Sequence, residues 1–125
     1  MSENYKSMYL ELNHVLLEAV SSHQEVVLCD MPDLLLRMKI AATYSLQELE
    51  TIFNEILNKV VRGEGPIVSD AAAYYHFPEV FCAPRDEYMA ALLHEIAQEE
   101  GVEQINCYIG NVHVKPISRL CNTNA

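Results

Sequence analysis

Basic residues are scarce in this chain, where 8 Lys and Arg stand against 18 Asp and Glu for a formal net charge of −10. Proteins that bind nucleic acids or anionic lipids meet the phosphates with a basic surface. The charge balance therefore argues against direct nucleic-acid binding and against membrane binding. It favours a protein partner with a basic surface, or mimicry of a polyanion, although excess acid also simply keeps a small domain in solution.

Glycine and proline are few, at 4 and 5 residues, which leaves little room for long linkers. No apolar run approaches the roughly 18 residues that indicate a membrane-spanning helix. Residues 1–6 are polar and lead into an amphipathic pattern, so we expect no signal peptide. These observations predict a cytoplasmic protein.

The usual signatures of metal and cofactor sites are also missing. The cysteines Cys29, Cys82, Cys107 and Cys121 form no C-x-x-C pair, and we expect reduced thiols. Zinc sites commonly use closely spaced ligand pairs, which the cysteines and histidines do not provide. Phosphate-loop, dinucleotide and nucleophile-elbow motifs are absent. We therefore expect no metal and no cofactor.

Three amphipathic helices are predicted in a chain of 125 residues, half of them apolar, which suits one domain. Apolar residues recur every three or four positions over residues 5–20, 46–60 and 84–97. Ser45 and Glu48 match a capping box at the start of the second helix. Residues 70–75 are expected to form one brief helical turn.

Two hairpins complete the predicted fold. Residues 25–29 read as a short strand, and the alternating apolar residues of 31–44 slightly favour a second strand over a helix begun by Asp30 and Pro32. Gly110-Asn111 between residues 104–108 and 112–115 predicts another hairpin. The expected fold class is α+β, with about three main helices packed on a small antiparallel sheet. Residues 1–115 would form this domain, and residues 116–125 a polar tail.

An aromatic segment between the second and third main helices is the first candidate binding site. It contains Tyr74, Tyr75, His76, Phe77 and Phe81. Aromatic side chains supply large contact areas at low entropic cost, so the segment suits a partner-binding surface, although such clusters also serve as core packing. Our hypothesis is that Tyr75 and Phe77 contact a partner.

Leu10 and Leu17 are the second candidate surface. They lie one heptad apart and nearly opposite the main apolar face of the first helix. A helix with a second apolar spot is sandwiched in the fold or used at an interface. The pair therefore makes a homodimer an alternative.

Cys82 carries the catalytic alternative, since a thiol near the start of a helix can become nucleophilic. A small enzyme or ligand-binding domain would place Tyr75, His76, Cys82 and His113 in one pocket. The acids Asp86 and Glu87 would oppose a thiolate there, and a buried, inert thiol is the simpler interpretation. We therefore predict a small acidic protein that binds another protein without catalysis, as an inhibitor, antagonist or chaperone-like binder.

Overall fold

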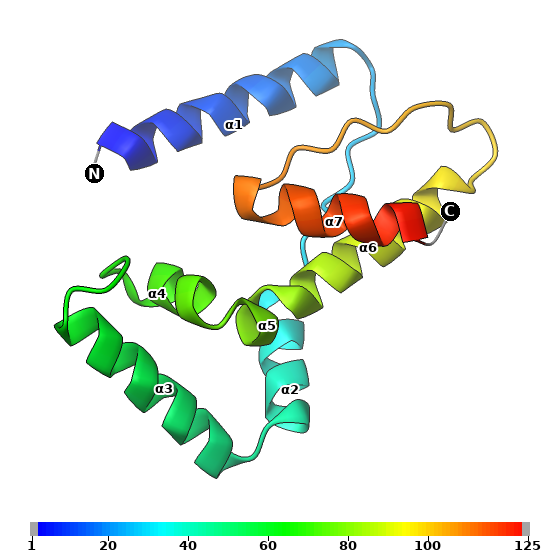
Figure 1. Ribbon diagram of the computed structural model, residues 1–125. Coiled ribbons are helices and arrows are strands. Elements are labelled where there is room, and N and C mark those ends of the chain that lie inside the picture. Colours follow the sequence, from blue (N-terminus) through cyan, green and yellow to red (C-terminus); the bar gives the residue numbers. More distant parts are fainter. Residues whose placement is uncertain (1–2, 124–125) are drawn as a thin grey trace.

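The computed structural model describes residues 3–123, and within them the fold is entirely helical. Figure 1 shows the order of the helices along the chain. Their bounds are α1 Glu3–Ser21, α2 Asp33–Thr43, α3 Leu46–Val61, α4 Ser69–His76, α5 Pro78–Phe81, α6 Ala83–Ala97 and α7 Asn111–Thr123. The expected α+β class is therefore wrong, because the described residues contain no strand and no sheet.

The core lies where α3, α4 and α5 meet. Its buried side chains are Ile56 from α3, Ala72 and Ala73 from α4, and Val80 and Phe81 from α5. The small alanine side chains of α4 allow its backbone to approach α3 closely. A second packed unit is formed by α6 and α7, which share the most extensive helix contact of the described chain; in Figure 1, α7 crosses in front of α6.

The helix α3 forms as predicted, with a capping box at its start. The Ser45 hydroxyl accepts a hydrogen bond from the Glu48 amide, and the Glu48 carboxylate accepts one from the Ser45 amide, both at 3.1 Å. These bonds satisfy two of the amides that a helix start leaves without partners. Beyond the helix, Gly63 and Gly65 adopt positive φ angles that L side chains rarely take, and the chain turns toward α4.

Residues 33–43 form α2, so the favoured strand interpretation of residues 31–44 was wrong and its helical alternative was right. Leu36 is buried and Ile40 half-buried, and their separation of four residues places them on one helix face. The apparent two-residue alternation arose because the opposite face of α2 is apolar as well. Pro32 precedes the helix and its carbonyl accepts the Leu36 amide.

The predicted C-terminal hairpin is also wrong, because Gly110-Asn111 begins a helix instead of a turn. The His113 amide donates to the Gly110 carbonyl at 3.0 Å. One face of α7 packs against the protein at the spacing i, i+3, i+4, i+7, i+8, and its members are His113, Pro116, Ile117, Leu120 and Cys121. Residues 116–123, expected as part of a polar tail, thus belong to α7; residues 124–125 of that tail lie outside the described residues.

The predicted strand at residues 25–29 is wrong too, since these residues run without regular structure from α1 to α2. Val26, Val27 and Leu28 are exposed there and pair with no other strand. A strand needs a neighbouring strand to pair with its backbone hydrogen-bonding groups. The expected neighbour, within residues 31–44, forms the helix α2 instead. The segment 22–32 therefore serves as an extended connection.

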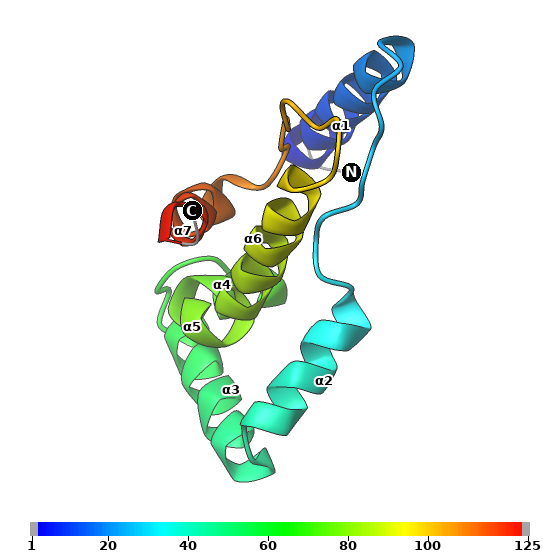
Figure 2. The same cartoon turned by 90° about the vertical axis from the view of Figure 1, so that its right-hand side faces the viewer.

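The helix α1 is confirmed but lies apart from the other helices, as Figures 1 and 2 show from two directions. None of the close helix pairs of the described chain includes α1; all of them form among the six helices from α2 through α7. Figure 2 also shows α2 and α3 diverging from their connecting turn, with α5 and α6 between their open ends. The molecule is consequently open in outline, and much apolar surface is left uncovered.

Candidate functional site

An ion pair connects the start of α6 to the segment before α2. The Arg85 guanidinium donates to both carboxylate oxygens of Asp30, at 3.1 Å and 2.8 Å, and lies over the Tyr74 ring at 5.3 Å. Burial alone would raise the pKa of Asp30, but the hydrogen bonds and charge of Arg85 outweigh it and lower that pKa. The pKa of Arg85 is raised, chiefly by its hydrogen bonds to Asp30.

A second pair joins α6 to α7 in the interior. Nδ1 of His113 lies 2.5 Å from Oδ1 of Asp86, and the two side chains are 5% and 7% exposed. Both buried side chains thereby have a hydrogen-bond partner. Among the described residues, no buried polar side-chain atom lacks one. Sequence reasoning missed this pair because Asp86 and His113 are 27 residues apart. The helical spacing of the apolar residues around His113 was the signal that could have indicated it.

Cys82 is buried at the junction of α5 and α6, and its pKa is raised. Burial is the main cause and the Asp86 carboxylate adds to it, while Arg85 opposes both. The thiol therefore stays protonated at neutral pH. This is the opposite of the activation that a helix start can provide.

The other three cysteines gather from three different segments of the chain. Cys107 forms a side-chain hydrogen bond with Cys29 and interacts with Cys121 on α7, and all four cysteines carry free thiols. Burial and these neighbours raise the pKa of Cys107 to about 11. Among the described residues, however, no group of three His, Cys, Asp or Glu side chains is arranged to hold a metal ion.

The predicted aromatic segment divides into packed and exposed residues. Phe81 is buried, with its ring centre 6.0 Å from that of Phe53, and Phe77 packs against the core beneath Lys59. Tyr74 lies under Arg85. Tyr75 is different, because 65% of it is exposed.

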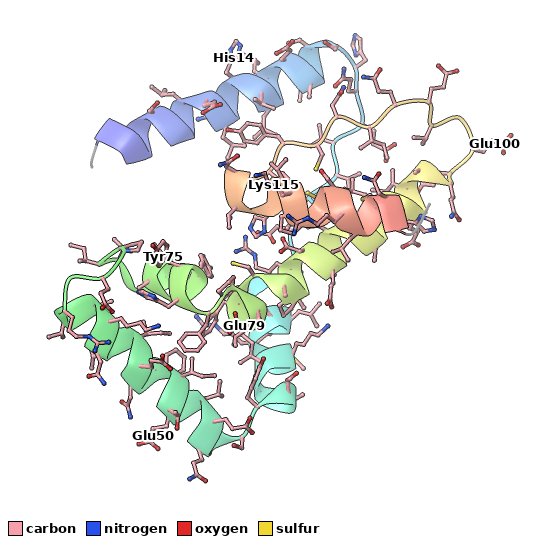
Figure 3. All side chains as sticks on the ribbon, viewed as in Figure 1. His14, Glu50, Tyr75, Glu79, Glu100 and Lys115 are labelled. Carbon is pink, nitrogen blue, oxygen red and sulfur yellow. The ribbon has the colours of Figure 1, made fainter. Side chains whose placement is uncertain are left out.

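Tyr75 lies beside the turn between α3 and α4, and Figure 3 labels it on α4. A side chain at Gly65 would approach the Tyr75 ring within 2.9 Å, so the ring packs closely on that glycine. His76 meets the Tyr75 ring edge-on at 4.9 Å and contacts the Glu64 carbonyl through Nε2 at 3.0 Å. These contacts hold Tyr75 in position without covering it.

Exposed apolar residues surround this turn, and we call them the α3–α4 corner: Val61, Ile67, Val68 and Tyr75. Each exposes 65% or more of its surface. The exposed acids Glu64 and Asp70 lie within the same stretch of chain, and so does the exposed Arg62, whose guanidinium pairs with Glu64 at 3.4 Å. The corner therefore combines an apolar centre with charged neighbours, two of them acidic and one basic.

The residues of the alternative pocket are not brought into one cavity. The structure places Tyr75 and His76 together at the corner, whereas Cys82 and His113 lie in the interior. A hollow of about 150 Å³ lies between α2, α5 and α6, with Ile40, Tyr44 and Val80 among its lining residues. A second hollow lies on the outer face of α3. Neither hollow is lined by any of the four residues of the alternative pocket.

The described helices include none that combines the length and the apolar character needed to cross a membrane. The fold itself defines an all-helical protein. Comparison with protein-family models, with curated proteins and with solved structures found no match to this chain.

Proposed function

We propose that this chain is a small acidic binding protein that acts on another protein without catalysis. The observation that carries the proposal is the α3–α4 corner, where a tyrosine that packs on Gly65 and three aliphatic side chains stand exposed beside acids. Aromatic residues held in place lose little entropy on binding and often dominate the energy of an interface. An inhibitor, an antagonist or a chaperone-like binder would all use such a surface.

The charge of the chain supports a basic partner. Acids outnumber basic residues by 18 to 8, and Glu64 and Asp70 lie next to the apolar corner. Complementary charges at the rim of an interface speed up encounter and select among partners, while the apolar centre supplies most of the affinity. A partner with an apolar depression bordered by Lys and Arg would fit these requirements.

The test is native mass spectrometry of the protein purified gently from its own cells. We expect a complex containing one other polypeptide, and we expect the double change Ile67→Ser with Tyr75→Ser to abolish it. The matched control is Leu46→Ser with Val112→Ser, which removes two exposed apolar side chains from other helices. A complex that survives the corner change but not the control change would contradict the proposed site, and a chain that carries no polypeptide would contradict the function.

Once the partner has been identified, the role of the acidic residues in binding can be tested separately. Replacing Glu64 with Gln and Asp70 with Asn should slow association and weaken its dependence on salt, while dissociation changes little. Stopped-flow association at two salt concentrations measures both. An unchanged association rate would remove the acids from the proposal but leave the apolar corner.

A further inference from the structure

Two segments without regular structure are fixed to neighbouring residues of α6. The Arg85 guanidinium donates to Asp30, which lies near the end of the segment that joins α1 to α2. The next residue, Asp86, binds His113 at the start of α7, just after the connection from α6. The charge of His113 also acts on Asp30. The ends of the two segments therefore lie close together.

Each of these segments carries one cysteine near its fixed end, and the two thiols are in contact. Cys29 directly precedes Asp30, and Cys107 lies six residues before His113. The side chains of Cys29 and Cys107 form a hydrogen bond with each other. Cys29 is half-buried and Cys107 is exposed, so a small molecule in solution can approach the pair.

The surrounding backbone suits a disulfide between these two thiols better than between other pairs. A disulfide requires Cβ atoms about 3.5–4.5 Å apart and a narrow range of torsion angles. Cys29 and Cys107 both lie outside the helices, so their backbones can adjust to this geometry. Cys121, which also interacts with Cys107, is fixed on α7, and Cys82 is buried at the start of α6.

We propose that Cys29 and Cys107 form a redox-modification site, at which a low-molecular-weight disulfide such as oxidised glutathione converts the two thiols into an intramolecular disulfide. The bond joins the segment between α1 and α2 to the connection between α6 and α7. Reversible disulfides of this kind occur in redox-sensing proteins of compartments that keep most thiols reduced.

The chemistry consists of two successive thiol–disulfide exchanges. The Cys29 thiolate attacks one sulfur of oxidised glutathione, the S–S bond of that molecule breaks, and the first glutathione leaves and takes up the proton that Cys29 lost. The Cys107 sulfur then attacks the Cys29 sulfur of the mixed disulfide, and its proton passes to the second glutathione as it leaves. Two protein thiols thereby lose two electrons and two protons, and one glutathione disulfide gains them as two reduced molecules.

The electrostatics of the cysteines determine which thiol attacks first. Burial, followed by the negative charge and the hydrogen bond of Cys29, raises the pKa of Cys107 to about 11. Cys107 therefore keeps its proton after Cys29 has lost its own, and it reacts second. Its attack is intramolecular and begins from contact, so it does not need the thiolate population that attack on a reagent in solution requires. Slow alkylation of Cys107 is thus compatible with closure of the disulfide.

The disulfide restrains the segment that carries α1. The Asp30–Arg85 ion pair holds the end of this segment against α6, and a bond to Cys107 adds a covalent connection beside it. The bond encloses roughly 80 residues, so it removes much of the freedom of the unfolded chain. On α1 itself, Leu10 and Leu17 are 59% and 66% exposed, and their use at an interface stays a prediction.

The experiment equilibrates the reduced full chain with mixtures of reduced and oxidised glutathione in the absence of oxygen. Remaining thiols are then blocked with N-ethylmaleimide, and intact-mass measurement and non-reducing peptide mapping identify the bonds. We expect one disulfide, between Cys29 and Cys107. Its equilibrium constant against glutathione should be at least about tenfold larger in the folded protein than in urea, and the oxidised chain should melt about 5 °C or more above the reduced chain.

Two variants test the pairing and the order of the steps. Cys121→Ser is the matched control, because it removes the third neighbouring thiol and should leave the disulfide in place. Cys107→Ser combined with Cys121→Ser should stop at a mixed disulfide between Cys29 and glutathione, since the second thiol is missing. Circular dichroism of each variant shows whether its helices are intact.

Three outcomes would overturn the proposal. One is a wild type in which Cys121 is the main disulfide partner, or in which all pairs form equally. Another is a wild type that accumulates glutathione adducts without closing a disulfide. The third is an equilibrium constant that is the same in the folded protein and in urea, because the fold would then not hold the two thiols together. None of these outcomes affects the α3–α4 corner, which contains no cysteine.

Discussion

Asp86 and His113 form a buried pair that fixes α7 against α6, with 2.5 Å between the carboxylate oxygen and the ring nitrogen. Asp86 lies in the first turn of α6 and His113 near the start of α7, and residues 98–110, which have no regular structure, join the two helices. Because neither side chain is open to water, each depends on the other for its hydrogen bond.

Removing one member of this pair should destabilise the protein strongly. Asp86→Ala leaves His113 buried without its partner, and we expect the free energy of unfolding to fall by about 3 kcal/mol. Urea denaturation at neutral pH measures the loss. The double variant with His113→Ala should lose less than the sum of the two single changes, by more than about 1 kcal/mol. Additive losses would mean that the two residues do not depend on each other.

The Asp30–Arg85 ion pair should make stability depend on pH. The pKa of Asp30 is lowered in the folded protein, so its contribution is present above the pKa of the unfolded chain, about 3.9, and is lost as the pH falls through the lower folded pKa. Arg85→Met should cost about 1 kcal/mol at neutral pH, since Asp30 is half exposed. The difference from wild type should shrink below about pH 4. A difference that stays constant down to pH 2 in urea titrations would show that packing, not charge, explains the loss.

Cys107 should react slowly with alkylating reagents. Its pKa is about 11, against an ordinary value of 9.0, and this lowers the thiolate fraction about a hundredfold. A more basic thiolate is also a stronger nucleophile, which recovers about tenfold of the rate. We therefore expect iodoacetamide to modify Cys107 about tenfold more slowly in the folded protein than in urea. Peptide mass spectrometry after timed labelling gives both rates.

The neighbouring thiols provide the control for this measurement. Changing Cys29 and Cys121 to Ser removes two groups that raise the pKa of Cys107, so labelling should become faster. If the rate matched that of the unfolded chain even in the wild type, the three cysteines would not be gathered as described.

The capping box of α3 should contribute measurably to stability. Ser45→Ala removes the hydroxyl that accepts the Glu48 amide, and we expect a loss of about 1 kcal/mol in urea denaturation. Thr51→Ala is the control, because the Thr51 hydroxyl only adds a bond to the Gln47 carbonyl within the helix. Equal effects of the two changes would argue against a specific role for the cap.

The sequence alone determined the elements that local interactions control. The period of α1, the capping box of α3 and the proline and acids at the start of α6 are short-range signals, and these three helices form where they indicate. The candidate residues could also be named from the sequence, but their environments could not. Tyr75 and Phe77 are two residues apart, yet one is exposed and the other packs against the core.

Tertiary structure decided the remaining elements because their local signals were divided. Leu34, Leu36, Met38 and Ile40 alternate as in a strand, but Leu36 and Ile40 also share a helix face, and packing against α5 and α6 selects the helix. The Val-rich start of α7 favours a strand locally. Burial of Ile117 and the long-range pairing of His113 with Asp86 favour a helix there. Both contacts form when residues 111–123 are helical and pack against α6.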